Sequence, residues 1–349
     1  KQKTAYEISL GLVGSEMCIR DRPRQDYVIA EFHLDDPMSV RPPYDEQLLP
    51  LPYWPEPLNS VVAGGVLWQR QILFVKGSCA DDVSYWLFRD TVTGSEPTMW
   101  TMWNLSEAIL PTAVALDRDA VIADSPGQQL TSARQLDGDR FTAIGQFGVD
   151  VDFYVASPLE TPRSTLRWGY DDSGQSEYQD LLHLQQNGSG AYYVALIPRL
   201  PDEASPEFET LGDGLVIRVR GSFGMDLSFL SAEDAKVDAD NAHFVGTAAS
   251  IQVRTNEQVL SLASAGEVHY ESYGLICESA VSAVFTHGGI CLTTLDEGIE
   301  PASVFICLPE NLRPTSGNPD ICVIGDGRCR YCLTIPLGSS PVELTLEPK

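Results

Sequence analysis

Short extended runs of apolar, β-branched and aromatic residues, each closed by turn residues, recur along this chain of 349 residues. In VLWQRQILFVKG, which begins at Val66, alternate residues fall on opposite faces, as in a half-buried strand. VSYWLFRDTV, FGVDVDFYVASP, GLVIRVRG, IQVRTNEQVLSLAS and GEVHYESYGL have the same character. Helical periodicity is almost absent, so nothing indicates helices that connect parallel strands. The sequence therefore predicts an all-β fold of antiparallel sheets packed as a sandwich.

Two segments carry local signals of their own. LLHLQQNGSGAYYVALIP has Asn187-Gly188 between two apolar runs, and this dipeptide supplies the positive φ angles of a tight turn. We therefore expect a β-hairpin in this segment. SEAILPTAVALDRD, residues 106–119, is the one stretch that indicates a short helix.

The composition changes near Tyr270. Before this residue the runs are long and carry tryptophans, whereas shorter β runs, most of the cysteines and the loop PENLRPTSGNPD follow it. We expect a large antiparallel β-sandwich over residues 23–269 and a smaller C-terminal β-module over residues 270–349. A boundary drawn from composition can be wrong by ten residues or more.

The first 22 residues differ in character from the rest of the chain. Their apolar stretch is short, is broken by Ser9 and two glycines, and ends in Glu16, so it does not fit a secretion signal. GLVGSEMCIRD and KQKTAYE can each be back-translated into DNA that resembles an end of a short-read library adapter. We therefore interpret residues 1–22 as a disordered adapter-derived segment, joined to the C-terminal part of a longer metagenomic reading frame.

The charge of the chain limits its partners. Against 23 Lys and Arg residues stand 49 Asp and Glu residues, and the net charge is −26. Such an acidic surface repels nucleic acid and anionic lipid, and no cluster of basic residues offsets it. No apolar run reaches the roughly 18 residues of a membrane span. We expect an acidic, folded protein with neither a nucleic-acid nor a membrane partner.

The cysteines gather in the last quarter of the sequence, at positions 277, 291, 307, 322, 329 and 332. Cys329-Arg-Tyr-Cys332 has the spacing of a zinc or redox motif, but CRYCLTIPL is typical of a strand, whose alternation points the two side chains to opposite faces. No second CxxC completes a four-ligand set. Buried free thiols are the favoured interpretation, a disulfide comes second, and we expect no metal site.

One long segment resembles a known family. WQRQILFVKGSCADDVSYWLFRDTVTGSEPTMWTMWNLSE resembles the C-terminal β-domain of heparinase II/III-type polysaccharide lyases. The shared pattern is a strand RxxLFVK, a short acidic loop, a strand YxxxRDT and a Trp-rich segment. GQFGVDVDFYVASP, EYQDLLHLQ and LGDGLVIRVRGSFGMDLSFLS resemble large bacterial members of the group. The likeness covers most of residues 26–269 and rests on structural rather than catalytic motifs.

The resemblance implies a lyase-type supersandwich that works with an N-terminal α/α toroid domain, which this sequence does not include. Such lyases cleave acidic, uronate-containing polysaccharides by β-elimination, with Tyr and His as base and acid. Some relatives hold a zinc ion in the β-domain through His and Asp. The family's His-x-His segment is not found after Pro23. We therefore expect no cofactor in this chain, no catalytic set of its own, little activity by itself, and a periplasmic or secreted location.

Three residues are candidates for substrate binding. The Arg70 guanidinium suits the geometry of a uronate carboxylate, and Trp100 and Trp103 could form a platform on which sugars stack. Packing in the core is the more ordinary fate of such a tryptophan pair. Arg89 could bind a carboxylate as well, although the adjacent Asp90 and the apolar YWLF before it favour a structural ion pair or a half-buried strand residue.

Other candidates are weaker. His33 has Asp35 and Asp36 nearby but no second histidine at ligand spacing, and the remaining four histidines stand singly in or beside strands. The acidic pairs Asp150/Asp152 and Asp238/Asp240 lack the glycine and the terminal Glu of a calcium loop. Two other functions stay open. A non-catalytic carbohydrate-binding or scaffold module needs no catalytic residues, whereas a β-rich glycoside hydrolase needs two converging carboxylates.

Overall fold

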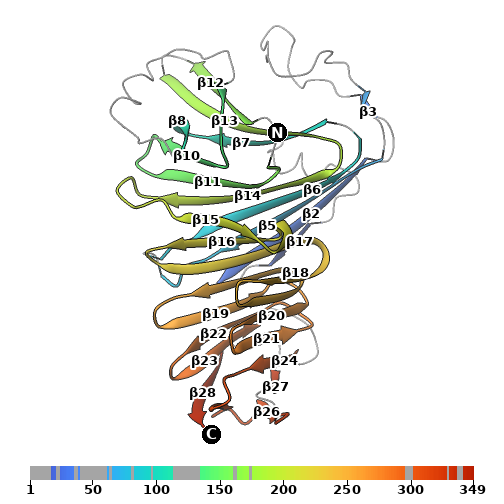
Figure 1. Cartoon of the computed structure of the whole chain (residues 1–349), viewed down its shortest axis with the longest axis vertical. Helices are drawn as coiled ribbons and strands as arrows, with labels where there is room; N and C mark the ends of the chain where they lie inside the picture. The colour runs from blue at the N-terminus through green and yellow to red at the C-terminus, as the bar shows by residue number, and fades with distance from the viewer. Residues whose placement is uncertain are drawn as a thin grey trace. The chain divides into compact units, whose positions relative to one another are not determined.

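The computed structural model describes residues 17–20, 24–34, 38–39, 61–62, 65–79, 82–95, 97–112, 134–159, 163–172, 175–294, 302–327, 330–335 and 341–349. Apart from one short 3₁₀ helix, η1 (Gly212–Gly214), the regular elements of these residues are β-strands, and they pair in antiparallel sheets (Figure 1). This confirms the predicted all-β, antiparallel sandwich class. It also confirms the strands expected from the sequence at residues 66–75, 85–93, 150–157 and 216–221.

Two compact units divide the chain, and the backbone passes between them several times. Unit 1 comprises Lys1–Met17, Ile29–Arg70 and Phe88–Glu203, and unit 2 comprises Cys18–Val28, Gln71–Leu87 and Ala204–Lys349. Each unit is built from segments that are distant in the sequence, so neither can be read as one continuous stretch. The predicted boundary near Tyr270 lies inside unit 2.

Two sheets contribute strands to unit 1. The eight-stranded sheet has the order β1-β2-β5-β6-β14-β11-β10-β8, and the four-stranded sheet has the order β7-β13-β12-β9. The bounds are β1 (Met17–Arg20), β2 (Gln25–Leu34), β5 (Val66–Val75), β6 (Tyr85–Thr93), β7 (Pro97–Asn104), β8 (Ser106–Pro111), β9 (Arg134–Gln135), β10 (Arg140–Gly145), β11 (Asp150–Ser157), β12 (Arg163–Asp172), β13 (Gln175–Asn187) and β14 (Gly190–Arg199). A separate short pair joins β3 (Met38–Ser39) to β4 (Val61–Val62).

The core of unit 1 lies between these two sheets. Trp100, Leu182 and Leu184 come from the four-stranded sheet and pack against Phe141, Phe153, Tyr192 and Val194, among others, from the eight-stranded sheet. Their alternation along each strand brings one apolar face of each sheet together, which is the packing of a β-sandwich.

One local prediction in unit 1 is wrong, and a second is contradicted over the part of it that the structure describes. Asn187-Gly188 joins β13 to β14, but these strands belong to different sheets, so the turn forms an arch and not a hairpin. Gly188 has the expected positive φ of 71°. Both strands carry apolar faces, and Leu182 and Tyr192 meet in the core from opposite sheets, which buries more apolar surface than a hairpin would. Residues 106–111, where a helix was expected, form strand β8; residues 113–119 lie outside the described residues.

The N-terminal segment also differs in part from its prediction. Residues 17–20, which we interpreted as disordered adapter, form β1 beside β2 at the edge of the eight-stranded sheet. An edge strand offers unpaired backbone N–H and C=O groups to any extended chain, because ladder hydrogen bonds require no particular side chain. The strand therefore leaves the origin of this segment open.

Unit 2 is built around a long, bent hairpin of strands β17 and β18. Their register shifts between Leu230 and Ala235, and on the far side of β18 its two halves pair with different strands. Residues Ala242–Gly246 pair with β20, whereas Ala249–Val253 pair with β19. The hairpin therefore joins two branches of one 14-stranded sheet. The strands concerned are β15 (Glu207–Leu211), β16 (Val216–Gly221), β17 (Gly224–Ala239), β18 (Ala242–Val253), β19 (Glu257–Leu262) and β20 (Gly266–Tyr270).

The remaining strands extend the two branches. One branch runs β19-β22-β23-β28-β25 and the other runs β20-β21-β24-β27-β26 (Figure 1). Their bounds are β21 (Tyr273–Cys277), β22 (Val281–Thr286), β23 (Gly289–Thr294), β24 (Ala302–Cys307), β25 (Leu312–Thr315), β26 (Cys322–Gly325), β27 (Arg330–Ile335) and β28 (Val342–Pro348). Leu260, Phe285 and Leu344 of the first branch share one apolar cluster with Leu275 and Leu333 of the second. This cluster is the core of unit 2.

Candidate functional site

Arg70, on strand β5, is held by a buried carboxylate. Its Nε donates to Asp90 Oδ1 at 2.8 Å and its Nη2 donates to Asp90 Oδ2 at 2.5 Å, while Trp68 Nε1 donates to Oδ2 at 3.1 Å. The Asp90 side chain is 0% exposed, whereas that of Arg70 is 42% exposed. The carboxylate anchors one edge of the guanidinium and leaves the rest of the group near solvent, so Arg70 is a rigid donor.

Asp90 thus forms its ion pair with Arg70, on the neighbouring strand. The Arg89 guanidinium lies over the ring of Tyr193, 5.2 Å from its centroid. Burial lowers the pKa of Arg89. The predicted alternative of a half-buried strand residue fits Arg89 better than the ion pair with Asp90.

Trp100 and Trp103 lie on opposite faces of strand β7, because residues three apart in a strand point in opposite directions. Trp100 is 1% exposed and packs edge-on against Phe88, with ring centroids 6.2 Å apart. Trp103 is 51% exposed. The two rings therefore do not form a shared platform, and Trp100 has its place in the core of unit 1. No contact between described residues joins Arg70 to either tryptophan.

Trp103 stands on the outer face of the four-stranded sheet. Strand register places Trp103 opposite Leu181, Thr101 opposite His183 and Met99 opposite Gln185. Because directly opposed residues share a face, these six side chains form one surface, which we call the Trp103 face. It combines an exposed indole with hydroxyl, imidazole and amide groups. The inner face of the same strands carries Trp100, Leu182 and Leu184.

His183 is the titratable group of the Trp103 face. Its Nδ1 lies 2.9 Å from the Met99 sulfur, and its Nε2 is buried without a hydrogen-bond partner among the described residues. Burial lowers the pKa of His183, so the imidazole is neutral near pH 7. A neutral imidazole can donate or accept a hydrogen bond, depending on its tautomer.

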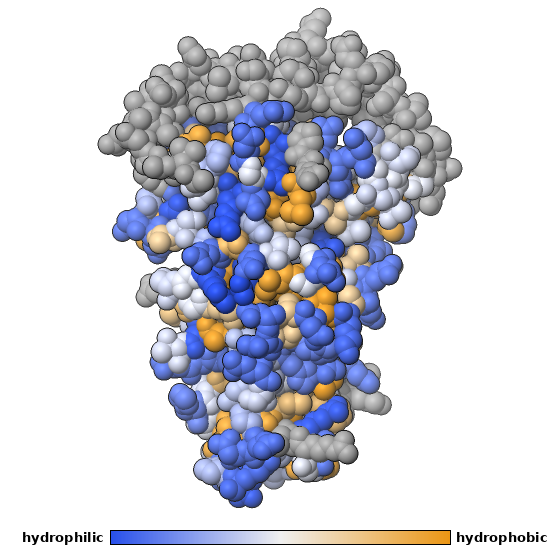
Figure 2. Space-filling view, viewed as in Figure 1, coloured by the Kyte–Doolittle hydropathy of each residue, from blue (hydrophilic) through white to orange (hydrophobic). Residues whose placement is uncertain are grey.

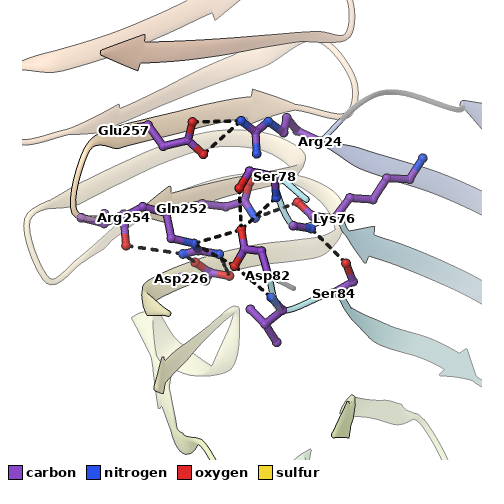
Figure 3. Close-up of polar contacts among 12 residues, drawn as sticks. Arg24, Lys76, Ser78, Asp82, Ser84, Asp226, Gln252, Arg254 and Glu257 are labelled. Atoms are coloured by element: carbon purple, nitrogen blue, oxygen red, sulfur yellow. Dashed lines mark hydrogen bonds and ion pairs between the residues drawn. The ribbon is translucent and has the colours of Figure 1, made fainter. Parts of the chain in front are cut away.

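The most buried charged cluster of unit 2 surrounds Arg254 (Figure 3). The Arg254 guanidinium bonds both oxygens of Asp226, with Nη2 3.3 Å from Oδ2, and its Nε lies 3.4 Å from Asp82 Oδ1. Nearby, Arg24 makes a bidentate pair with Glu257 at 3.0 Å. These groups come from three separate parts of the chain, near residues 24, 82 and 226–257, so no local motif could have indicated the cluster.

The cluster shifts several pKa values. Burial raises the pKa of Asp226, and burial together with the Asp226 charge raises the pKa of Tyr85 well above its usual range. Burial opposes the charge of Asp82, but hydrogen bonds from Ser78 and the Arg254 charge outweigh it and lower the pKa. Tyr85 and Asp226 are both 0% exposed. A Tyr of this kind cannot reach a polymer substrate, so we assign the cluster to stability and not to catalysis.

Two histidines form a second cluster in unit 2. His243 and His269 face each other across β18 and β20, with ring centroids 6.1 Å apart. His243 Nδ1 lies 2.6 Å from Asp238 Oδ1, and His269 Nε2 lies 2.6 Å from Glu267 Oε1. The sequence alone did not link His243 to His269, because β18 and β20 become neighbours only in the folded chain.

Three of the four carboxylates considered for calcium are bound to arginines, and the fourth, Asp238, is paired with His243. Asp150 and Asp152 contact Arg199 at 3.5 and 2.7 Å, and Asp240 contacts Arg218 at 2.7 Å. Within the part of the chain that the structure describes, no three His, Cys, Asp or Glu side chains are grouped so that they could hold a metal ion.

The cysteines differ in exposure, and Cys79, Cys277, Cys291, Cys322 and Cys332 are free thiols. Cys277 is buried, Cys291, Cys307 and Cys332 are intermediate, and Cys79 and Cys322 are exposed. Cys329, the other half of the CxxC motif, lies outside the described residues. His33, which the sequence placed among the weaker candidates, is exposed, and its Nε2 lies 3.7 Å from Glu31 Oε2.

On the face drawn in Figure 2 the described residues are predominantly hydrophilic, with small apolar patches between them. Among the described residues no helix has the length and apolar character that a membrane crossing requires. No protein-family model matches the chain. No curated protein matches it either.

Proposed function

We propose that this chain is the polysaccharide-binding β-sandwich portion of a heparinase II/III-like lyase that cleaves uronate-containing polysaccharides by β-elimination. The observation that carries the proposal is the Trp103 face. A pyranose has one apolar face of C–H groups and a rim of hydroxyls. An exposed indole on the same face as the Thr101 hydroxyl and the Gln185 amide offers a partner to both.

Arg70 supplies the group that a uronate requires. Asp90 holds the guanidinium in one orientation, so little side-chain entropy is lost when a carboxylate binds to its exposed part. The acidic surface does not forbid such a ligand. At physiological salt the Debye length is about 8 Å, so distant carboxylates are screened from the bound uronate.

The chemistry of β-elimination needs a group that neutralises the carboxylate, a base for the C5 proton and an acid for the leaving O4. Tyr85 and Tyr193 are fully buried, and His243 and His269 are each paired with a carboxylate. The family resemblance assigns base and acid to an α/α toroid domain. The proposal therefore gives this chain the role of binding, and a lyase assay of the chain alone should show almost no unsaturated uronate.

Binding to alginate and heparan oligosaccharides tests the proposal, with isothermal titration calorimetry as the measurement. Trp103→Ala should raise Kd about tenfold, because the stacking surface is removed while the inner face of β7 is unchanged. Phe147→Ala is the matched control, since Phe147 is an 80% exposed aromatic in the turn that follows β10. A wild-type chain that binds none of these polymers would contradict the proposal.

The contribution of Arg70 needs a pair of variants, because removing Arg70 alone leaves a buried carboxylate. Asp90→Asn keeps the guanidinium and should bind uronates nearly as well as the wild type. Arg70→Gln in the Asp90→Asn background removes the cation but retains a neutral pair, and it should weaken binding of uronate polymers by about tenfold. Equal affinities of these two variants would exclude Arg70 from the site.

A second candidate function is a carbohydrate-binding module that has no catalytic partner. The buried state of Tyr85 and Tyr193 favours it equally, because a binding module needs no accessible base. The two candidates differ in the intact gene: only the lyase requires a helical toroid and a His-x-His segment encoded on the same chain.

A further inference from the structure

Trp86 stands on the outside of strand β6. Its two chain neighbours, Tyr85 and Leu87, are 0% exposed and point into unit 2, so the alternation of the strand directs Trp86 to the other face. The Trp86 side chain is 36% exposed. The indole is therefore displayed on the face of the strand opposite to the Tyr85 and Leu87 side chains.

A second aromatic ring holds this indole in place. Phe74, on the neighbouring strand β5, stacks against Trp86 with ring centroids 4.6 Å apart and an angle of 10° between the planes. Stacking from one side restricts the rotamers of Trp86 while other parts of the indole stay exposed. The ring is therefore ordered before any ligand arrives, which lowers the entropy cost of binding.

A hydrogen-bond donor, the Lys76 ammonium, lies near the Phe74 ring, and an acceptor, the Asp26 carboxylate, is paired with it. Lys76 Nζ is 5.8 Å from the centroid of Phe74 and 2.7 Å from Asp26 Oδ1. Both side chains keep about a quarter of their surface exposed, 23% for Lys76 and 26% for Asp26. Figure 3 shows that the Lys76 side chain extends away from the Arg254 cluster. An ammonium next to a carboxylate matches the hydroxyls of a sugar, which donate and accept at once.

We propose that Trp86, Phe74, Lys76 and Asp26 form a second polysaccharide-binding subsite, in which a pyranose stacks on the indole and its hydroxyls bond to Lys76 and Asp26. Nucleobases also stack on aromatic rings, but a net charge of −26 opposes a phosphate backbone. The Lys76–Asp26 pair is neutral as a whole, which suits sugar hydroxyls. The inference rests on the proposed function for its class of ligand, and it places a subsite in unit 2.

Calorimetry with oligomannuronate on the full chain tests the subsite. Trp86→Ala should raise Kd about tenfold, and Trp86→Phe, which keeps a ring, should raise it only two- to threefold. Phe74→Leu should raise Kd by an intermediate factor, because the apolar volume remains while the stacked support is lost. Far-UV circular dichroism of each variant checks the fold, and Phe147→Ala is the control for loss of an exposed ring. A poly-dT oligonucleotide should not bind.

The pattern across variants separates this inference from the proposed function. If Trp103→Ala weakens binding and Trp86→Ala and Trp86→Phe do not, the subsite is wrong and the Trp103 face stands. If only the Trp86 variants weaken binding, the subsite stands and the Trp103 face is wrong. A wild-type chain that binds no polysaccharide overturns both, and tight binding of poly-dT overturns the ligand class of the subsite.

Discussion

Asp90 shows how one buried carboxylate decides the role of its neighbours. It accepts hydrogen bonds from the Arg70 guanidinium and the indole N–H of Trp68, whereas the Arg89 guanidinium lies over the ring of Tyr193. The sequence pattern proposed Asp90 for Arg89 because the two are adjacent. In a strand, however, adjacent residues point to opposite faces, and the cross-strand neighbour is the closer partner.

Replacing Arg70 should therefore cost more stability than replacing Asp90 with its amide. Arg70→Ala leaves the carboxylate of Asp90 buried with only the Trp68 donor, and the loss should be about 3–5 kcal/mol. Asp90→Asn should cost less, since a neutral amide can still accept from Trp68. Urea denaturation of the two variants measures the difference, and equal losses would contradict the buried ion pair.

His183 predicts a pH dependence of stability. Burial lowers the native pKa below its ordinary value of 6.5, so in acid the unfolded chain binds a proton that the native chain does not. Above about pH 7 the imidazole is neutral in both states, so His183 does not make the free energy of unfolding depend on pH. The free energy of unfolding should then fall as the pH drops below 6.5. The fall should end once the pH is below the lowered native pKa of His183.

The His183→Gln variant isolates this contribution. It lacks the titrating group and keeps a polar side chain of similar length, so its loss of stability between pH 7.5 and pH 5.5 should be smaller than that of the wild type. Urea denaturation at the two pH values gives the comparison. The same loss in both proteins would show that other groups control the acid response.

The β13 and β14 strands show what decides a turn at the scale of elements. Asn187-Gly188 is correctly identified as a sharp turn, because its positive φ is a local property. Whether the flanking strands pair with each other is not local. Each has an apolar face, and the sandwich of unit 1 buries both faces only when the strands lie in different sheets.

The hairpin of β20 and β21 offers a test of close packing. A Cβ added at Gly274 would overlap the imidazole of His269, which lies over the glycine across the two strands. Gly274→Ala should therefore destabilise unit 2 by about 1–3 kcal/mol. In a His269→Ala background the same change should cost clearly less, because only the close contact with Cys307 Cβ at 3.1 Å remains. Thermal or urea unfolding of the four proteins forms a double-mutant cycle, and additive losses would contradict the steric explanation.

At the scale of the whole molecule, each unit gathers distant segments around a core of its own. The core of unit 2 draws Leu260 from before Tyr270 and Leu275, Leu333 and Leu344 from after it. Strand β20 ends at Tyr270 and pairs with β21, which begins at Tyr273. The predicted module boundary stays a prediction, and the shared core makes it testable.

A chain truncated after His269 should fail to fold in unit 2. The truncation removes one partner of β20, all of strands β21–β28, and about half of the shared apolar cluster, which leaves exposed sheet edges and apolar surface. We expect aggregation, or a loss of cooperative unfolding, in size-exclusion chromatography and calorimetry. A soluble, cooperatively folded fragment would support a module boundary near Tyr270.

Strand content, strand positions and the antiparallel class were determined by the sequence itself, because alternation, β-branched residues and turn dipeptides act within a few residues. The sequence also identified Arg70, Trp100 and Trp103 as candidates, although their roles stay predictions. Only the tertiary structure decided that Trp100 is buried and Trp103 exposed, since which face of a strand becomes the core depends on the sheet that packs against it. The partner of Arg70 and the support of Trp86 were decided in the same way, by strands that meet only in the folded chain.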